Sequence, residues 1–495
     1  MNTEIKQIPK EKFKFVQLDT SIHDVKFETK PVGYFKDAWL RFKRNKGSVV
    51  AACIILILLL YAIIVPFFSP YNTTFRDSYY HCTKPKSKFF SKFGFWDGTY
   101  KMTVNQQGYD YWAAITAPDK DGNIRSAIVK VLDKYVKTNA GRTNTYYDII
   151  LDSYLKVGYE YRFVTKEEYD NILKHQEETG IQLLYPMVDT KKILVQGDAN
   201  DANYWFEYDL RGRATRDENG NYIDIFLRDE NGDYVYYVEK MGGNQYQIRV
   251  FYYDYFVYVH DREPCFLFGT DGYGQDIFSC LAVGARLSFI LSICVAAINF
   301  TIGTLYGAIE GYYGGWIDII LERISDILNG VPFIVTASLF QMHLASKVGV
   351  IGSLLFAFVL TGWLGTAYRV RTQFYRFKGQ EYILAARTLG AGDSRLIFRH
   401  ILPNSIGTIV TSSVLMIPGV IFTESSLSYL NIINLQSSTM TSVGTLLSNG
   451  QKYLSSDPHV IFFPAMFISL LMISFNIFGN GLRDAFNPSL RGAEE

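Results

Sequence analysis

The chain has 495 residues, of which 48% are apolar, and a formal net charge of +1. This length exceeds that of one domain, and the near-zero charge excludes a protein that binds nucleic acid through a strongly basic surface. The mean hydropathy is close to zero only because long uncharged runs are averaged with a charged, tyrosine-rich segment. The composition therefore predicts a protein embedded in membrane lipid that also carries a large water-exposed part.

Residues 1–46 are predicted to be a cytoplasmic tail that ends in a helix lying along the inner membrane surface. No signal peptide is expected, because charges are spread through this segment and no small-residue cleavage site follows the first apolar run. The apolar positions with helical spacing are Phe35, Ala38, Trp39 and Phe42. For residues 1–30, a disordered tail is an equal alternative.

Six uncharged runs are long enough to cross about 30 Å of hydrocarbon. They are residues 47–68, 287–309, 327–346, 348–368, 401–423 and 459–482. The first span is taken to end by residue 70. Another uncharged run, 425–451, is rich in Ser, Thr and Asn and is predicted to be a re-entrant or surface segment.

Basic residues set the expected orientation. They cluster at 41–46, before the first span, and at 369–399, after the fourth. Cytoplasmic loops carry such an excess, so both termini are predicted to be cytoplasmic. Glu424 lies at the end of an apolar run and is a candidate functional residue within the membrane, whereas Glu310 is expected to reach the interface.

Residues 71–265, between the first two spans, are numerous enough for a domain of their own and are extracellular by this topology. Their turn signals predict a mixed α+β fold. The expected helices are 126–138, 146–157 and 165–177. The expected strands are 191–196, 203–209 and 246–259. The many tyrosines suit either a peptide-contacting surface or ordinary packing of strand faces.

Two DENG sequences, at 217–220 and 229–232, predict hairpin turns. With DKDGN at 119–123 they could bind calcium, but the terminal Glu of a calcium loop is lacking, so turns are the better interpretation. Cys82 and Cys265 bracket the insert, and a disulfide between them could close its neck. Two free thiols are the alternative, because the sequence does not give the distance between the two residues.

Residues 381–404, EYILAARTLGAGDSRLIFRHILPN, predict a helix, a glycine turn and a second short helix between two spans. Ile383, Ala386 and Leu389 have helical spacing. Gly390 and Gly392 stop the helix. Asp393 or Ser394 can cap the second helix, and Pro403 marks the start of the next span. A loop of this kind is shaped to be held by a partner outside the membrane.

No enzyme signature is present. The chain lacks G-x-x-x-x-G-K-[ST], H-E-x-x-H, G-x-S-x-G and paired C-x-x-C motifs. The Gly-rich sequence GTDGYGQD (269–276) lacks the lysine of a phosphate-binding loop. We expect no catalytic residue, no metal site and no cofactor bound by this chain.

From residue 266 to 492 the chain resembles the membrane subunits of the OppC/DppC type, from ATP-binding-cassette importers of oligopeptides and dipeptides. The resemblance rests on several motifs in order: FGTDGYGQDIFS (268–279), GARLS (284–288), GYYGGWID (311–318), residues 381–404, TESSLSYL (423–430) and GNGLRDAFNPSLR (479–491). The first 70 residues also fit. The sequence departs from the family pattern at Leu384, where the motif often has Glu, and at Gln275 and Cys280, which replace arginines.

The resemblance implies an all-α polytopic membrane protein with the six-helix type I importer permease fold, carrying an inserted extracellular α+β domain. Residues 266–492 would be a five-helix core, and residues 380–404 its cytoplasmic coupling loop, known in that family as the EAA motif. The coupling residues carried over or inferred at matching positions are Glu381, Ala385, Ala386, Arg387, Gly390, Asp393, Arg399, Leu402 and Pro403. Of these, Arg387 and Arg399, with Arg395, are expected to pair with acidic groups on a partner.

The expected function is that of a permease subunit for peptides. Its partners would be an OppB-like second subunit, two cytoplasmic ATPases that hold the ATP and Mg²⁺, an extracellular peptide-binding lipoprotein, the peptide and membrane lipid. The insert is expected to contact the binding protein or cover the pore entrance, with a purely structural role as the alternative. The second function considered is a membrane-anchored extracellular sensor or binding module. A simple anchor does not require a structured cytoplasmic loop.

Overall fold

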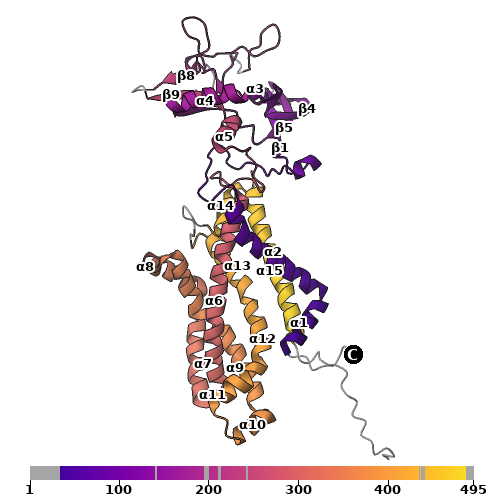
Figure 1. Cartoon of the computed structure of the whole chain (residues 1–495), viewed down its shortest axis with the longest axis vertical. Helices are drawn as coiled ribbons and strands as arrows, with labels where there is room; N and C mark the ends of the chain where they lie inside the picture. Colours follow the sequence, from indigo (N-terminus) through magenta and orange to yellow (C-terminus); the bar gives the residue numbers. More distant parts are fainter. Residues whose placement is uncertain are drawn as a thin grey trace, which may run out of the picture.

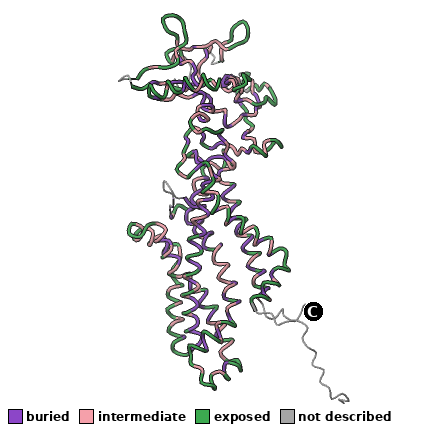
Figure 2. The backbone as a smooth tube through the Cα atoms, in the orientation of Figure 1, coloured by how far each residue is buried: buried purple, intermediate pink, exposed green. Residues whose placement is uncertain are grey.

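The computed structural model describes residues 34–139, 142–193, 200–209, 213–240, 244–433, 435 and 441–486. The molecule is elongated, with a bundle of long helices at one end and a smaller region of strands and helices at the other (Figure 1). Buried residues run along the inner faces of the long helices and continue into the connection between the two parts (Figure 2). The tail predicted for residues 1–30 lies outside the described residues.

The chain enters the bundle through two helices, α1 (Tyr34–Arg44) and α2 (Lys46–Phe68). The predicted first helix is confirmed: Ala38 and Phe42 are buried against Ala485 near the end of the last helix, while Phe35 and Trp39 face outward. Helix α2 is apolar all round, and only four of its 23 residues are buried, as expected of a helix with lipid on several sides.

Five helices in the described part of the chain are long and apolar enough to cross a membrane. They are Lys46–Phe68, Ile277–Tyr313, Phe333–Lys378, Asp393–Tyr429 and His459–Phe486. In the element numbering, the first two are α2 and α6 (Ile277–Tyr313), the third contains α8 (Phe333–Gly362) and α9 (Leu364–Lys378), and the last is α15 (His459–Phe486). The fourth contains α11 (Asp393–Arg395), η4 (Leu396–Ile401), α12 (Leu402–Val414) and α13 (Met416–Tyr429).

The third of these helices is not one rod, because it doubles back at Gly349. This glycine has φ +80° inside α8. The rings of Phe333 and Phe358 are 4.9 Å apart, whereas a straight helix would separate these residues by about 38 Å. Ser353 Oγ also donates to Gln341 Oε1 at 2.9 Å. The predicted boundary between 327–346 and 348–368 therefore falls at a real reversal, although the predicted start at 327 is wrong, because α7 (Gly315–Asn329) ends there.

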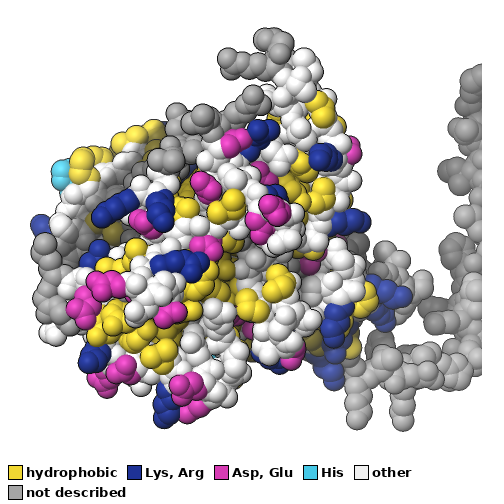
Figure 3. Space-filling view, turned by 90° about the horizontal axis from the view of Figure 1, so that it is seen from above, with side chains coloured by type: hydrophobic (Ala, Val, Ile, Leu, Met, Phe, Trp, Pro, Cys, Tyr) yellow, Lys and Arg dark blue, Asp and Glu magenta, His cyan; other side chains and the backbone are white. Residues whose placement is uncertain are grey.

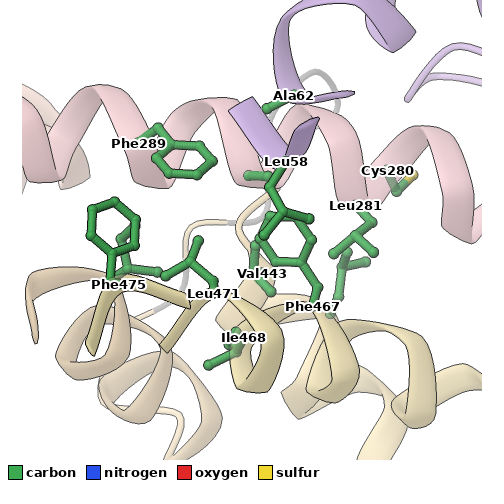
Figure 4. Packing of buried hydrophobic residues seen from close by; sticks show 13 residues of the cluster. Leu58, Ala62, Cys280, Leu281, Phe289, Val443, Phe467, Ile468, Leu471 and Phe475 are labelled. Carbon is green, nitrogen blue, oxygen red and sulfur yellow. The ribbon is translucent and has the colours of Figure 1, made fainter. Parts of the chain in front are cut away.

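The uncharged run 425–451 does not form a long helix. Helix α13 (Met416–Tyr429) ends inside it, and α14 (Val443–Gly450) is a buried eight-residue helix. One core cluster joins α14 to three long helices through Leu58, Leu281, Val443, Phe467 and Leu471 (Figure 4). The short helix is thus packed into the end of the bundle that faces the insert, as expected of a re-entrant segment.

In its described residues the insert contains a three-stranded sheet, a four-stranded sheet, a separate pair of short strands and several helices. One sheet has the order β1 (Thr99–Asn105), β5 (Arg142–Asp152), β4 (Ile128–Asn139), and the other has β6 (Tyr159–Thr165), β9 (Gln245–Phe251) and β7 (Leu184–Tyr185), with β8 (Tyr237–Glu239) also on β9. The separate pair consists of β2 (Thr116–Pro118) and β3 (Ile124–Ser126). The helices are η2 (Phe90–Phe93), α3 (Gln106–Ala114), α4 (Lys166–Thr179), η3 (Thr190–Lys192) and α5 (Tyr252–His260).

Several predictions for the insert need correction. The helix at 165–177 is confirmed as α4, with the Thr165–Glu168 capping box. The helices expected at 126–138 and 146–157 are instead the antiparallel strands β4 and β5. The strand expected at 246–259 ends at Phe251 and continues as α5. Of the other expected strands, 203–209 contains only isolated bridges, and half of 191–196 lies outside the described residues.

The DENG and DKDGN sequences form turns of one kind. In each, the first aspartate accepts hydrogen bonds from backbone N–H groups two and four residues later, as Asp217 does from Asn219 and Asn221. The glycine has positive φ, +84° at Gly220. Bridges such as Arg216 with Tyr222 continue the hairpin. The aspartates are thus used as turn residues.

The insert joins the bundle through a neck in which the outgoing and returning chains are hydrogen bonded. Cys82 N donates to the Asp271 carbonyl at 2.9 Å, and Gln275 Nε2 donates to the Thr73 carbonyl at 2.6 Å. Gly274, with φ +70°, has no room for a Cβ, which would lie 1.7 Å from the Asp77 carbonyl oxygen. Helix α6 begins directly after this neck, so the insert is fixed to it.

Candidate functional site

Residues 381–404 lie at the end of the bundle opposite the insert (Figure 1). The predicted order of helix, glycine turn and second helix is confirmed by α10 (Glu381–Thr388), Gly390 with φ +85°, and α11 (Asp393–Arg395). A π-helical turn, η4 (Leu396–Ile401), then leads into α12 (Leu402–Val414). Pro403 lies in the first turn of α12, as predicted.

The loop is held to the bundle by an apolar core. Ile383, Leu396 and Ile401 are completely buried. They pack with Val370 and Phe374 of α9 and with residues of α6 and α12. Each fully buried aliphatic side chain contributes roughly 1.5–3 kcal/mol. This loop is therefore a rigid extension of the helices.

Tyr312, near the end of α6, ties both halves of the loop together. Its hydroxyl donates to Asp393 Oδ1 at 2.5 Å and accepts a hydrogen bond from Arg387 Nη2 at 3.2 Å. Asp393 and Ser394 do not cap α11, whose N-cap is Gly392, so that prediction is wrong. Arg387 is exposed as well as bonded to Tyr312, so its expected pairing with a partner stays a prediction.

The outer face of the loop carries exposed residues of both kinds. Leu389 is 88% exposed, although its spacing had placed it with the buried Ile383. Other exposed loop residues are Glu381, Tyr382, Leu384, Ala385, Arg395, Phe398, Arg399 and Pro403. Ala386 and Leu402 are half-buried. A rigid base under an exposed leucine with nearby arginines is typical of a docking site.

A charged cluster near the loop joins α6, α7 and α9. Arg371 makes two hydrogen bonds to Asp318, at 2.7 and 2.9 Å, and two to Glu322, at 3.0 and 3.2 Å. Glu310 lies 3.5 Å from Arg371 and is 3% exposed. The expectation that Glu310 reaches the interface is therefore wrong, because its carboxylate is paired inside the bundle.

Arg371→Met should destabilise the protein by about 3 kcal/mol, because it leaves three neighbouring carboxylates without their shared cation. The check is thermal unfolding of the purified chain in detergent. Arg369→Met, at an exposed position on the same helix, is the control and should leave the unfolding temperature unchanged. Equal unfolding temperatures for the two variants would contradict a stabilising role for the cluster.

Helices α6 and α9 meet along three glycines of α6. A Cβ on Gly307 would lie 2.2 Å from the Ala367 carbonyl oxygen, and a Cβ on Gly311 would lie 2.8 Å from that of Arg371. Gly303 makes the same approach to the Trp363 carbonyl oxygen, at 2.7 Å. The spacing of four residues places these glycines on one face, so the two backbones are in direct contact.

Glu424 is buried between three helices. Ser288 Oγ of α6 donates to its carboxylate at 3.0 Å, and Ser428 Oγ of α13 does so at 3.1 Å. Ser442, the N-cap of α14, contributes a third hydroxyl. Close backbone contacts at Gly284 and Gly444 surround the group. Through these hydrogen bonds Glu424 connects α6, α13 and the short helix α14. The functional role predicted for Glu424 within the membrane stays a prediction.

Cys82 and Cys265 are separate thiols in the structure. Cys82 is buried beside Ile277 and Phe463. Burial raises the pKa of Cys82 to about 12. Cys265 Sγ lies 3.4 Å from the Lys86 carbonyl oxygen, to which it donates.

Glu160 in β6 should make the stability of the insert depend on pH. Burial, with a smaller effect from Asp201, raises its pKa from 4.5 to about 7. Because the folded state holds a proton that the unfolded chain releases, stability falls as the pH rises through this window and is lowest above pH 7. Partial exposure screens the effect, so Glu160→Gln should raise the unfolding temperature by about 2–4 °C at pH 8.

The same variant should change nothing at pH 4. Near-ultraviolet circular dichroism of the purified chain at the two pH values would follow the unfolding. The exposed Glu167→Gln serves as the control. A gain that is equal at both pH values would rule out Glu160 as its source.

Tyr312, Arg371 and the glycines of α6 were not singled out from the sequence. Tyr312 and Arg371 act through partners more than 45 residues away, which no local pattern gives. The glycines do leave a signal, since G-x-x-x-G-x-x-x-G at 303–311 is the pattern of closely packed membrane helices.

Two family models and several curated proteins match parts of this chain. The family described as "Binding-protein-dependent transport system inner membrane component" matches residues 287–492, and the "N-terminal TM domain of oligopeptide transport permease C" matches residues 33–85. The oligopeptide transport system permease protein OppC of Bacillus subtilis is 43% identical over 224 residues, covering 45% of this chain and 72% of that protein. The dipeptide transport system permease protein DppC of the same organism is 40% identical over 225 residues, covering 45% and 69%.

Among solved structures, a chain of the MetNI methionine ABC transporter in an inward-facing conformation is similar to 42% of this chain and 96% of its own length. Its identity is 16% and its TM-score is 0.35. Residues 381–404 fall inside the first matched range, whereas residues 86–286 fall in neither.

Proposed function

Because the chain belongs to the family of binding-protein-dependent transport system inner membrane components, we propose that it is a permease subunit of an ATP-driven importer of peptides. It would form half of the translocation pore, and an OppB-like subunit would form the other half. Two cytoplasmic ATPases would bind and hydrolyse ATP, and an extracellular peptide-binding lipoprotein would deliver the substrate. The chain itself is not an enzyme.

In this proposal the bundle makes six crossings. Five helices have the required length, and the third doubles back at Gly349, which supports a sixth crossing through α7 and the first half of α8. Residues 381–404 and the termini would be cytoplasmic and residues 71–265 extracellular. The opposite placement of the loop and the insert on the bundle supports this orientation (Figure 1).

The observation that carries the proposal is the exposed Leu389 on a loop whose base is fully packed. Leu389 would enter a cleft on the ATPase, and Arg395 and Arg399 would pair with acidic groups around that cleft. Nucleotide-driven movement of the ATPases would then be passed to α6, α9 and α12 through the buried side chains beneath.

Leu389→Asp tests this mechanism. The tagged chain is purified from native membranes in mild detergent, and the co-purifying proteins and their ATP hydrolysis are measured. The variant should lose the ATPases and peptide uptake, because a charge would replace the leucine that the ATPase cleft buries. The chain should stay folded, because Leu389 is exposed in the chain alone. Leu454→Asp, equally apolar and 56% exposed but located after α14, should retain both. Retention of the ATPases by Leu389→Asp would overturn the docking role.

We propose further that the insert contacts the binding protein or covers the pore entrance. Its outer face mixes acidic and basic side chains with apolar ones, without one dominant sign, which suits a reversible protein contact (Figure 3). Replacing residues 99–260 by a flexible linker would keep the neck and remove the domain. Normal binding-protein docking and uptake in this variant would leave the insert with only a structural role.

A membrane-anchored sensor is not favoured. An anchor needs one or two spans, whereas this chain has at least five and a packed loop at their far end.

A further inference from the structure

The loop of residues 86–97 carries a cluster of exposed aromatic rings close to the bundle. Phe89, Phe93 and Phe95 are 64%, 66% and 52% exposed. We call these three residues the aromatic tip. Large aromatic side chains gathered on a surface in this way mark a site that contacts something apolar.

The tip is an ordered structure. Ser87 N donates to the Trp96 carbonyl at 2.8 Å, and Lys86 bridges to Asp97, so the loop is closed at its base. Between them, η2 ends at Gly94, whose φ of +78° turns the chain back. The ring of Phe90 lies 5.2 Å from that of Trp96 and 5.3 Å from that of Phe95. The exposed rings are therefore held on a packed base.

The base of the loop rests on the first turns of a membrane-spanning helix. The ring of Trp96 is 5.9 Å from that of Phe463, the fifth residue of α15, and 6.2 Å from that of Phe268. With 28 residues, α15 is about 42 Å long and exceeds the roughly 30 Å hydrocarbon thickness. The charged residues of α15, Arg483 and Asp484, lie in its last turns, whereas its apolar run begins at Val460, directly after Asp457 and His459. The start of α15 is therefore close to the boundary between hydrocarbon and headgroups, and Trp96 lies at the level where tryptophan is enriched in membrane proteins.

The position of the loop also agrees with a contact with lipid. It lies on the same side of the molecule as α2, a helix with only four buried residues (Figure 1). Phe67 and Phe68, at the end of α2 that is nearest the insert, are 73% and 81% exposed. Exposed aromatic side chains therefore occur both at this end of α2 and on the tip.

The charge of the loop agrees with a lipid surface. Residues 84–96, KPKSKFFSKFGFW, contain four lysines and no acidic residue. Lys88 pairs with Glu263 at 2.8 Å but keeps 73% of its side chain exposed, and Lys92 is exposed within η2. Lysines beside aromatic rings suit an interface with phosphate headgroups.

We propose that the aromatic tip inserts into the headgroup region of the leaflet nearest the insert and anchors the insert to the membrane surface. The insert is then held at two places, by the neck to α6 and by the tip to lipid. This inference requires only that the helices cross a membrane, and it holds whichever protein docks on the loop at the other end.

The test uses the full chain in nanodiscs of phosphatidylglycerol and phosphatidylethanolamine. A trifluoromethyl group is placed on the ring at position 93, and in a second sample at Phe163. Phe163 is a matched control, because it is a phenylalanine 58% exposed on β6 of the same insert. Lipids with a spin label in the headgroup should broaden the fluorine signal at position 93 several-fold more than that at position 163.

Equal broadening at the two positions would overturn the proposal, because it would mean that protein or water, and not lipid, surrounds the tip. A second probe at Phe89 guards against a local distortion caused by the label at 93. A Phe89→Ser/Phe95→Ser variant carrying the label at 93 should lose the excess broadening. Broadening that persists in this variant would show that the aromatic cluster is not the anchor.

Discussion

Gly390→Val should abolish peptide uptake while leaving the chain inserted and folded. Gly390 has φ +85°, a conformation that costs a β-branched residue at least about 1–2 kcal/mol. No atom lies within 4 Å of a Cβ built there, so the penalty is backbone strain alone. The loop would relieve this strain by changing the turn between α10 and α11, and Leu389 would leave its docking position. Uptake of labelled peptide by cells producing the variant measures the effect.

Gly392→Val is the matched control. Gly392 is two residues away, equally exposed and equally free of neighbours, but its φ of −74° and ψ of +161° suit valine. Normal uptake with this variant and none with Gly390→Val would assign the effect to the left-handed turn. Normal uptake in both would remove the coupling role from the turn.

Gly307→Leu should prevent stable folding of the bundle. The first added atom would meet the Ala367 carbonyl oxygen at 2.2 Å, and the backbone of a helix cannot rotate away as a side chain can. Overpacking of this kind costs about 3 kcal/mol or more. The folded fraction after extraction in detergent, measured by size exclusion and thermal unfolding, should fall sharply.

Gly365→Leu supplies the comparison. Gly365 lies on α9, the partner of α6, and has no atom within 4 Å of its added Cβ. This variant should fold as the parent does, because the new side chain points into open space. Similar losses in both variants would mean that leucine is harmful anywhere in α9 or α6, and that the glycine contact has no special importance.

The spans and the 381–404 loop could be predicted because their signals are local. Uncharged runs define the long helices, and the Gly390 turn needs only its own residue type. The insert was harder, as β4 and β5 show. Most of β4 is exposed on both faces, so its sequence lacks the alternation that identifies a strand. In β5, by contrast, Tyr147, Ile149 and Leu151 are buried in alternation, a signal that the helix prediction overlooked.

The site could be predicted in outline but not in its contacts. The sequence pointed to Gly390, Pro403 and the exposed Arg399, all of which the structure places as expected. It gave no sign that Arg387 also contacts Tyr312, 75 residues earlier, because no local pattern shows such a contact. It also treated Glu310 as a single ionisable group. Its cation comes from α9, 61 residues later, on a helix that packs closely against the glycines of α6.

The continuous length of α6 has a thermodynamic consequence. This helix runs 37 residues, about 56 Å, from the neck of the insert to Tyr312. Its glycines bring its backbone into direct contact with α9, so the two helices have no flexible side chains between them. A displacement at either end is therefore felt at the other. If a ligand of the insert shifts α6, the affinity of the loop for its own partner must change, and the reverse effect must have the same factor. Measuring either affinity with and without the other ligand would give this shared factor.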